Sequence, residues 1–143
     1  MLRGISPLIS PDLLHALARM GHGDELVFAD TYFPGDSTNA RVLRADGLLI
    51  RDLLDAILPL YVLDAYVATP LAMMAPAGGD RLDPAVEASY RAVIERHYPG
   101  TPAPARLDRL AFYERARRAF AVVMTGDTAL YGNLIVAKGN TLR

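Results

Sequence analysis

The sequence contains no cysteine, and this absence excludes several chemistries. Disulfide bonds, thiolate nucleophiles and zinc sites built on cysteine are all ruled out. A strong charge of either sign is also missing, because the formal net charge is −1 and the lysines and arginines are dispersed. Binding to a phosphate backbone would need a basic stripe, so we expect no nucleic-acid partner.

An uninterrupted apolar segment of membrane-spanning length is missing as well. Residues 56–77 contain one charge, Asp64, and are long enough to cross a bilayer. However, Pro59, Pro70 and Pro76 divide this segment into pieces too short to cross, which makes buried strands the better interpretation. The first residues also lack the charged, apolar and small-residue regions of a secretory leader. We therefore expect a cytoplasmic protein with no membrane association.

Several active-site motifs are absent too. The sequence has no glycine-rich phosphate loop, no HExxH and no G-x-S-x-G motif. No group of histidines and carboxylates has the spacing of metal ligands. On these grounds we expect the protein to use no metal and no nucleotide or other cofactor.

Enough apolar residues are present to form the core of one domain covering residues 1–143. The chain is 52% hydrophobic and 22% charged, which is typical of a globular protein rather than a disordered one. Segments with helical and strand character alternate over the whole length, so we predict an α/β fold built on a layered sheet. Part of the apolar content is expected to cover a subunit interface.

The individual elements can be predicted from capping residues and hydrophobic patterns. Ser10 followed by Pro11 predicts a helix start, and Gly21 predicts where that helix stops. By the same criteria we predict helices at 11–20, 51–58, 84–98 and 112–119. Apolar runs predict strands at 26–29, 41–44, 65–68, 71–75, 120–124 and 134–137. The segment 99–104, PGTPAP, is predicted to be a surface linker.

The stretch at residues 20–30, MGHGDELVFAD, carries the most distinctive residues. His22 lies between two glycines, which give the backbone freedom on both sides and leave the imidazole unshielded. Histidine can accept and return a proton near neutral pH, because its unperturbed pKa lies there. Asp30 follows the predicted strand 26–29 and begins a turn-rich loop over 30–39. In open α/β sheets, ligands bind at such carboxyl ends of strands.

A second group of polar side chains lies near the end of the sequence. Arg109 and Tyr113 are four residues apart and would share one face of a helix. Tyr131 and Asn133, on either side of Gly132, would share one face of a strand or converge through a turn. Arginine and asparagine offer fixed hydrogen-bonding groups, and tyrosine offers a flat apolar face with a hydroxyl. This combination suits a small neutral polyol.

Each of these residues also has a purely structural interpretation. Arg109 could form a surface ion pair with Asp108 or Glu114, and Tyr131 could be a half-buried strand aromatic. His22 could be no more than a polar turn residue. Composition and spacing leave both interpretations open.

Three blocks of the sequence carry a family resemblance. They are GHGDE at 21–25, AFYERA at 111–116 and ALYGN at 129–133. With the segments around them they match, end to end and in order, the ribose pyranase / fucose mutarotase family, which the chain resembles. The AFYERA block resembles the fucose mutarotase branch more than the ribose branch.

The resemblance implies a fold, an activity and an assembly. The fold would be a three-layer α/β/α sandwich with a mixed, largely parallel sheet. The activity would be cofactor-free interconversion of the α and β anomers of a monosaccharide such as L-fucose. The protein would form a ring-shaped homo-oligomer, a decamer, with sites shared between adjacent subunits.

Site residues follow from the same resemblance, position by position. His22 would be the acid/base histidine, and Tyr113 or Tyr131 would transfer the second proton. The sugar-binding residues would be Asp30, Arg109, Tyr131, Gly132 and Asn133.

The sequence leaves two alternative functions open, and it leaves the distance between His22 and Asp30 open. The protein could be a D-ribose pyranase, or a non-catalytic sugar-binding accessory protein. A straight strand over 23–30 would hold His22 and Asp30 roughly 20 Å or more apart, at ~3.3 Å per residue. Either the turn at 23–25 folds back before a shorter strand, or the two residues of one site come from different subunits.

Overall fold

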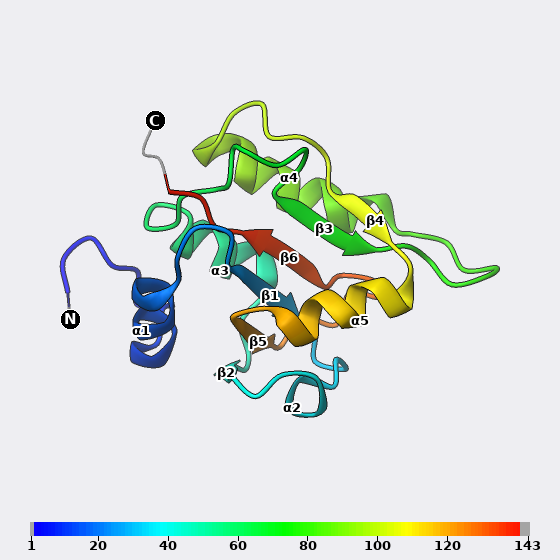
Figure 1. The fold of residues 1–143 in the computed structure, drawn as a ribbon, viewed down its shortest axis with the longest axis horizontal. Coiled ribbons are helices and arrows are strands. Elements are labelled where there is room, and N and C mark those ends of the chain that lie inside the picture. The colour runs from blue at the N-terminus through cyan, green and yellow to red at the C-terminus, as the bar shows by residue number, and fades with distance from the viewer. Residues whose placement is uncertain (1, 141–143) are drawn as a thin grey trace.

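A six-stranded mixed sheet forms the centre of the protein, as seen in the computed structural model, which describes residues 2–140 (Figure 1). The strands are β1 (Glu25–Ala29), β2 (Val42–Ala45), β3 (Leu71–Met74), β4 (Ala105–Leu107), β5 (Ala121–Thr125) and β6 (Leu134–Ala137). Their order across the sheet is β2-β5-β1-β6-β3-β4. The pairs β1–β5, β2–β5 and β3–β4 are parallel, whereas β6 runs antiparallel to both of its neighbours, β1 and β3.

Helices cover both faces of this sheet. They are α1 (Pro11–Arg19), α2 (Gly35–Thr38), α3 (Ile50–Ile57), α4 (Pro84–His97) and α5 (Arg109–Arg118). Leu26 and Phe28 of β1 belong to a core that also contains buried residues of α1, α3 and α4. Val27 and Ala29, which point to the opposite face, belong to a second core with buried residues of α5. The three-layer α/β/α arrangement and the mixed, largely parallel sheet are therefore confirmed.

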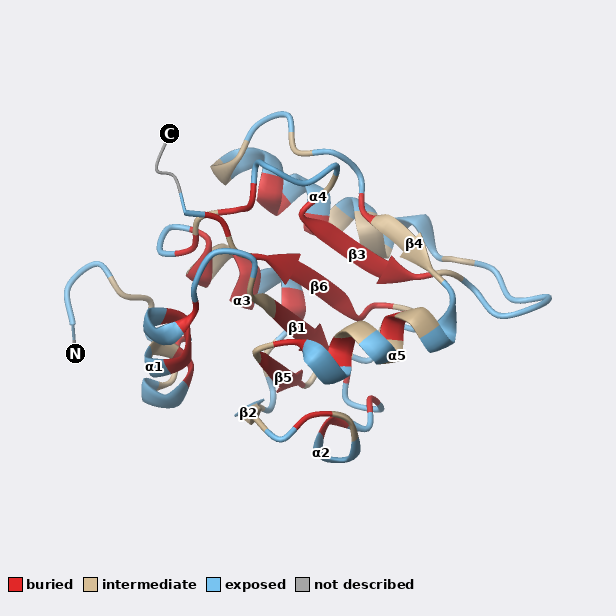
Figure 2. Ribbon diagram, in the orientation of Figure 1, coloured by how far each residue is buried: buried red, intermediate tan, exposed pale blue. Residues whose placement is uncertain are grey.

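The central strands are buried along their length, as the apolar runs predict. Every residue of β3, β5 and β6 is buried, and Figure 2 shows these strands in red between the more exposed helices. Such burial on both faces explains why the strands read as continuous apolar runs and not as alternating patterns.

Most predicted helices are confirmed within a few residues. The Ser10 side chain accepts the Leu13 N–H at the start of α1, and Pro11 takes the first helical position. Asp83 caps α4 in the same way. Helix α5 begins at Arg109, three residues before the predicted start, because Asp108 accepts the Ala111 N–H as its N-cap. The loop at 30–39 contains the short helix α2.

The predicted strand at 65–68 is wrong. These four residues are exposed and form bends, so their apolar side chains do not enter the sheet. Just before this segment, Leu63 forms an isolated bridge with Lys138, the residue after β6, and the Asp64 N–H donates to the Ala137 carbonyl at 3.1 Å. Conversely, the three-residue edge strand β4 was not predicted, because its half-buried residues show neither a buried run nor an alternation. No helix in the described residues 2–140 is long and apolar enough to cross a membrane.

Candidate active site

A cavity of about 430 Å³ opens where β1 and β3 reach their carboxyl ends. Asp30 follows β1 directly, and Ala75 follows β3. The start of α5 contributes Arg109 and Tyr113 to the wall, and the turn before β6 contributes the side chains that close it. The predicted site residues on the cavity wall are Asp30, Arg109, Tyr113, Tyr131 and Asn133, whereas the predicted binding residue Gly132 does not line it. Positions more than a hundred residues apart in the sequence therefore line one cavity.

Asp30 and Asn133 form the buried polar floor of this cavity. The Asn133 Oδ1 atom accepts the Asp30 backbone N–H at 2.7 Å, and the Asp30 carboxylate accepts the Tyr32 N–H at 2.9 Å. Both side chains are buried. Burial raises the pKa of the Asp30 carboxyl above its usual value of 3.8, although backbone hydrogen bonds from Tyr32 and Phe33 oppose the shift.

The raised pKa of Asp30 predicts a pH-dependent stability difference for the Asp30→Asn variant. The native state binds the Asp30 proton more tightly than the unfolded chain, so wild-type stability falls as pH rises from the ordinary pKa through the raised one. Asparagine keeps an oxygen acceptor for the Tyr32 N–H and does not ionise. Asp30→Asn should therefore unfold at higher urea concentration than wild type above that pH range, and the difference should vanish below it.

The exposed Asp36→Asn variant is the matched control for this measurement. It removes one carboxylate from the neighbouring helix α2 without changing a buried group, so its stability difference from wild type should stay small at all pH values. A constant difference between Asp30→Asn and wild type across the pH range would contradict the shifted pKa.

Aromatic side chains form one wall of the cavity. The rings of Phe33 and Tyr113 stack with centroids 5.2 Å apart and planes 12° from parallel. Phe33 also meets the buried Phe112 edge to face. This packing holds Tyr113 against the second core, so that its ring faces a defined position in the cavity.

Arg109 is held by Tyr113 and not by an ion pair. Its guanidinium carbon lies 5.5 Å from the centre of the Tyr113 ring. Among residues 2–140, Asp108 is used as the N-cap of α5, and Glu114 pairs with Arg117. The structural interpretation of Arg109 as a partner of Asp108 or Glu114 is therefore wrong, and its donors line the cavity.

Tyr131 has a backbone conformation that is unusual for a residue with a side chain. Its φ is +56°, and it is the one non-glycine residue with positive φ in the described part of the chain. Gly132 follows in a tight position, where an added Cβ would lie 2.9 Å from the Ala129 carbonyl oxygen. The hydroxyl of the buried Tyr90 donates to the Gly132 carbonyl at 2.7 Å. These contacts turn Tyr131 and Asn133 toward one cavity, so the interpretation of Tyr131 as a strand aromatic is wrong.

Phe33, Tyr90 and Asp80 take part in this arrangement and were missed in the sequence. Tyr90 supports Gly132 from α4, and Asp80 lines the cavity beside Tyr131. The residues Gly78-Gly79-Asp80 are typical of a turn, but nothing in the sequence indicates that this turn reaches Tyr131. For Tyr90, the helical pattern indicates burial without indicating its partner.

His22 lies at the other end of β1, away from the cavity. The turn that carries it is tied to the end of β6, because the Gly23 N–H donates to the Lys138 carbonyl at 2.8 Å. The His22 Nε2 atom is 3.5 Å from the buried carboxylate of Asp64, and its ring lies 5.5 Å from the Tyr66 ring. About half of the imidazole remains exposed.

The strand therefore separates His22 from Asp30 within one chain. β1 is straight over Glu25–Ala29 and pairs with β5 and β6, so the turn before it does not fold back toward the cavity. Of the two arrangements that the sequence leaves open, the turn at 23–25 that folds back toward Asp30 is therefore excluded. A site containing both residues requires a second copy of the chain.

Comparison with known proteins gives consistent matches. Residues 3–141 match the model of a family described as the RbsD / FucU transport protein family. The chain is 44% identical to the fucose mutarotase of Streptococcus pneumoniae, crystallised with L-fucose, over 99% of this chain and 100% of that one, with a TM-score of 0.91. It is 40% identical to FucU from Bifidobacterium longum, over 98% and 100% of the two chains, also with a TM-score of 0.91.

A more distant structure shares the fold. Bacillus subtilis RbsD, in complex with D-ribose, is 18% identical over 99% of this chain and 100% of that one, with a TM-score of 0.73. At this identity the similarity is evidence for a common architecture only.

Proposed function

The chain belongs to the RbsD / FucU transport protein family, and on this basis we propose that it is a sugar mutarotase that interconverts the α and β anomers of L-fucose or a related monosaccharide. The observation that carries the proposal is the single cavity lined by Asp30, Arg109, Tyr113, Tyr131 and Asn133. It combines hydrogen-bonding groups with aromatic faces, as recognition of a neutral polyol requires. The similarity to a fucose mutarotase at 44% identity supports the choice of sugar.

Mutarotation makes modest chemical demands that these side chains meet. One proton leaves the anomeric hydroxyl and another reaches the ring oxygen, so that the ring opens, rotates about C1–C2 and recloses. General acid/base catalysis contributes about 10²–10⁴-fold to such a reaction. We assign one proton transfer to His22 and the other to Tyr113 or Tyr131, with Asp30, Arg109 and Asn133 binding the hydroxyls.

The proposed site is shared between two copies of the chain. His22 of one copy would complete the cavity of the next, since one chain holds it at the far end of β1. Exposed apolar side chains at both places support such a contact: Tyr32 and Leu130 on the cavity wall, and Tyr66 beside His22. A head-to-tail contact of this kind closes into a ring when the rotation permits, and we propose a decameric ring in the cytoplasm.

Nuclear magnetic resonance saturation transfer between the two anomeric protons tests the proposal. Purified protein should accelerate exchange in L-fucose above the uncatalysed rate. The same measurement on D-ribose addresses the alternative activity, because a ribose pyranase would exchange pyranose and furanose signals faster than it exchanges fucose anomers. Binding of these sugars without faster exchange would instead identify a sugar-binding accessory protein.

A further inference from the structure

A buried tyrosine of α4 holds the turn before β6 from outside the cavity. The Tyr90 hydroxyl donates to the Gly132 carbonyl at 2.7 Å, and Tyr90 is only 2% exposed. Gly132 lies between Tyr131 and Asn133, which both line the cavity, whereas Tyr90 does not line it. Tyr90 therefore contacts the backbone that carries two of the proposed sugar-binding residues, without reaching the sugar itself.

The turn before β6 is fixed by a few specific hydrogen bonds. The Asp127 carboxylate accepts the Ala129 N–H at 3.0 Å and the Ile50 N–H, at the start of α3, at 3.1 Å. Gly132 is then held through both of its peptide groups. Its N–H donates to the Ala129 carbonyl at 3.2 Å, and its carbonyl accepts the Tyr90 hydroxyl.

A second cavity adjoins this turn on the side of α3 and α4. Its volume is about 220 Å³, and its wall includes Arg51 of α3, Ser89 and Tyr90 of α4, and Asp127 and Ala129 of the turn. Packed side chains therefore do not fill the space behind the turn. Hydrogen bonds must supply much of the restraint that close packing gives elsewhere in a protein interior.

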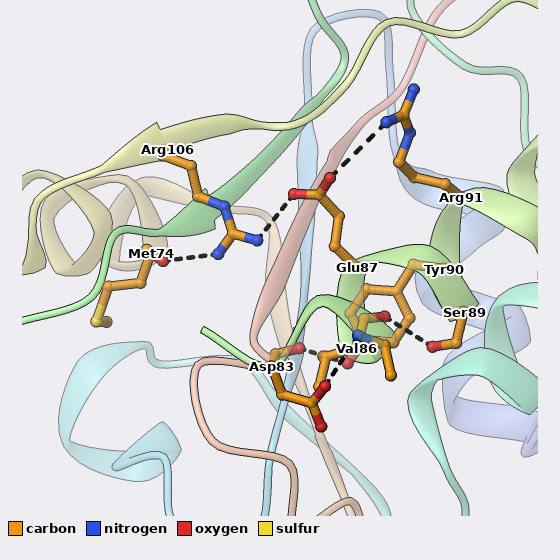
Figure 3. Close-up of polar contacts among 10 residues, drawn as sticks. Met74, Asp83, Val86, Glu87, Ser89, Tyr90, Arg91 and Arg106 are labelled. Carbon is orange, nitrogen blue, oxygen red and sulfur yellow. Dashed lines mark hydrogen bonds and ion pairs between the residues drawn. The ribbon is translucent and has the colours of Figure 1, made fainter. Parts of the chain in front are cut away.

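Helix α4 is a fixed support for the Tyr90 hydroxyl. Arg106 of β4 donates to Glu87, one turn before Tyr90, at 2.8 Å and to the Met74 carbonyl of β3 at 2.9 Å (Figure 3). Asp83 caps the start of the same helix. The helix is thus tied to the strand whose last residue, Met74, lines the cavity.

The Tyr90 hydroxyl also keeps its proton. Burial, together with the carboxylates of Asp127 and Asp30, raises the pKa of this hydroxyl above its ordinary value of 10.0. It is therefore a hydrogen-bond donor at neutral pH and well above it. Its ring packs in the core that contains the buried residues of α1 and α3.

Gly132 is required by the same arrangement. An added Cβ would lie 2.9 Å from the Ala129 carbonyl oxygen and 3.1 Å from the Tyr90 hydroxyl oxygen. Any side chain at this position would displace the turn or Tyr90. A residue that does not line the cavity can therefore still serve binding, because its backbone accepts the contact from α4.

We propose that Tyr90 is a positioning residue for sugar binding, which acts through the Gly132 carbonyl to hold Tyr131 and Asn133 toward the sugar hydroxyls. The proposal rests on the mutarotase function proposed above and adds a residue of α4 to its binding site. Groups that are held in place before the sugar arrives bind it more tightly, because ordering them then costs no free energy of binding. Tyr90 transfers no proton to or from the sugar.

The Tyr90→Phe variant removes the hydroxyl and keeps the ring in the core. The affinity for L-fucose, measured by calorimetry, should fall about tenfold, because a buried hydrogen bond that orders the binding turn is lost. The exchange rate at low sugar concentration should fall by the same factor. At saturating sugar it should stay within about twofold of wild type, since a loss of uniform binding raises KM and leaves kcat unchanged.

Tyr61→Phe is the matched control. Tyr61 is as buried as Tyr90, and its hydroxyl donates to the Val136 carbonyl at 2.8 Å. Val136 lies inside β6, where it pairs with Leu26 of β1 and Leu71 of β3, so the sheet holds it without the phenol. Tyr61→Phe should lower the urea midpoint about as much as Tyr90→Phe and leave the affinity for L-fucose unchanged.

Three results would overturn the assignment of Tyr90: wild-type affinity in Tyr90→Phe, an equal loss of affinity in Tyr61→Phe, or a loss confined to the rate at saturating sugar. Each leaves the proposed mutarotase function in place, because that function depends on exchange catalysed by the wild-type protein. A wild-type protein that binds L-fucose without accelerating exchange would overturn the function, and the two affinities would still decide the role of Tyr90. A wild-type protein that does not bind L-fucose would overturn both.

Discussion

Replacing His22 by alanine is expected to slow anomeric exchange of L-fucose by about 10²–10⁴-fold, the contribution of a well-placed general acid or base. The affinity for the sugar should change little, because in the proposed shared site the binding groups belong to the cavity of another copy and His22 does not line the cavity of its own chain. His22 is about half exposed at a turn, so the substitution should leave the fold intact. Saturation transfer measures exchange, and calorimetry on the same sample measures binding.

Mixed assemblies test whether His22 completes a neighbouring site. Arg109→Ala impairs the cavity, and His22→Ala impairs the end that would cover the next cavity. Each variant alone should be nearly inactive. When the two are co-expressed, about a quarter of head-to-tail contacts in a randomly mixed ring would join an intact His22 to an intact cavity. Activity should therefore return to a measurable fraction of wild type.

A failure to recover activity is interpretable only if the Arg109→Ala and His22→Ala chains are shown to be in one assembly. Distinct affinity tags on the two variants allow mixed assemblies to be purified by two successive captures. If such assemblies remain as inactive as the single variants, His22 and Arg109 do not meet across copies. The shared-site proposal would then be wrong, even if His22→Ala alone abolishes exchange.

Replacing Phe112 by alanine is expected to lower the free energy of unfolding by about 3–5 kcal/mol, as for other large aromatic residues removed from a core. Phe112 is fully buried in the second core and contacts the ring of Phe33. Its loss would leave a cavity under α5, the helix that carries Arg109 and Tyr113. Urea unfolding at a fixed protomer concentration measures the change, since the proposed assembly would make apparent stability depend on concentration.

Leu110→Ala is the matched control in the same helix. The Leu110 side chain is 82% exposed in the described chain, so truncation should change stability by less than about 0.5 kcal/mol in the separated protomer. If Phe112→Ala also changed stability by so little, the second core would not hold α5 as described. Leu110→Ala also tests the proposed ring, because a smaller assembly in this variant would place Leu110 in the contact between copies.

The sequence by itself was sufficient for most local structure. Ser10 and Pro11 mark the start of α1 because capping depends on a few neighbouring atoms, and the apolar run at 134–137 coincides with β6. The spacing of Leu53, Leu54 and Ile57 predicts the buried face of α3, since a helix repeats every 3.6 residues. Collinear motifs were also sufficient for the family.

Local hydrophobic patterns do not indicate which strand pairs with which. Residues 65–68 have an apolar composition typical of a strand, but a strand needs a partner, and β6 and β4 already occupy both edges of β3. Tyr66 and Val67 are exposed there, and the Tyr66 ring lies beside the His22 ring. The apolar composition of residues 65–68 therefore predicts a buried strand, but in the folded chain these residues form exposed apolar surface.

The tertiary structure alone decided how the site residues come together. The cavity depends on the sheet order, which places the end of β1, the end of β3 and the turn before β6 together. Asp80 meets Tyr131 across 51 positions through a turn whose place is set by β4 and α4. The separation of His22 from Asp30 likewise follows from β1 pairing as a straight strand on both sides. Such contacts depend on packing between distant segments, and no local propensity encodes them.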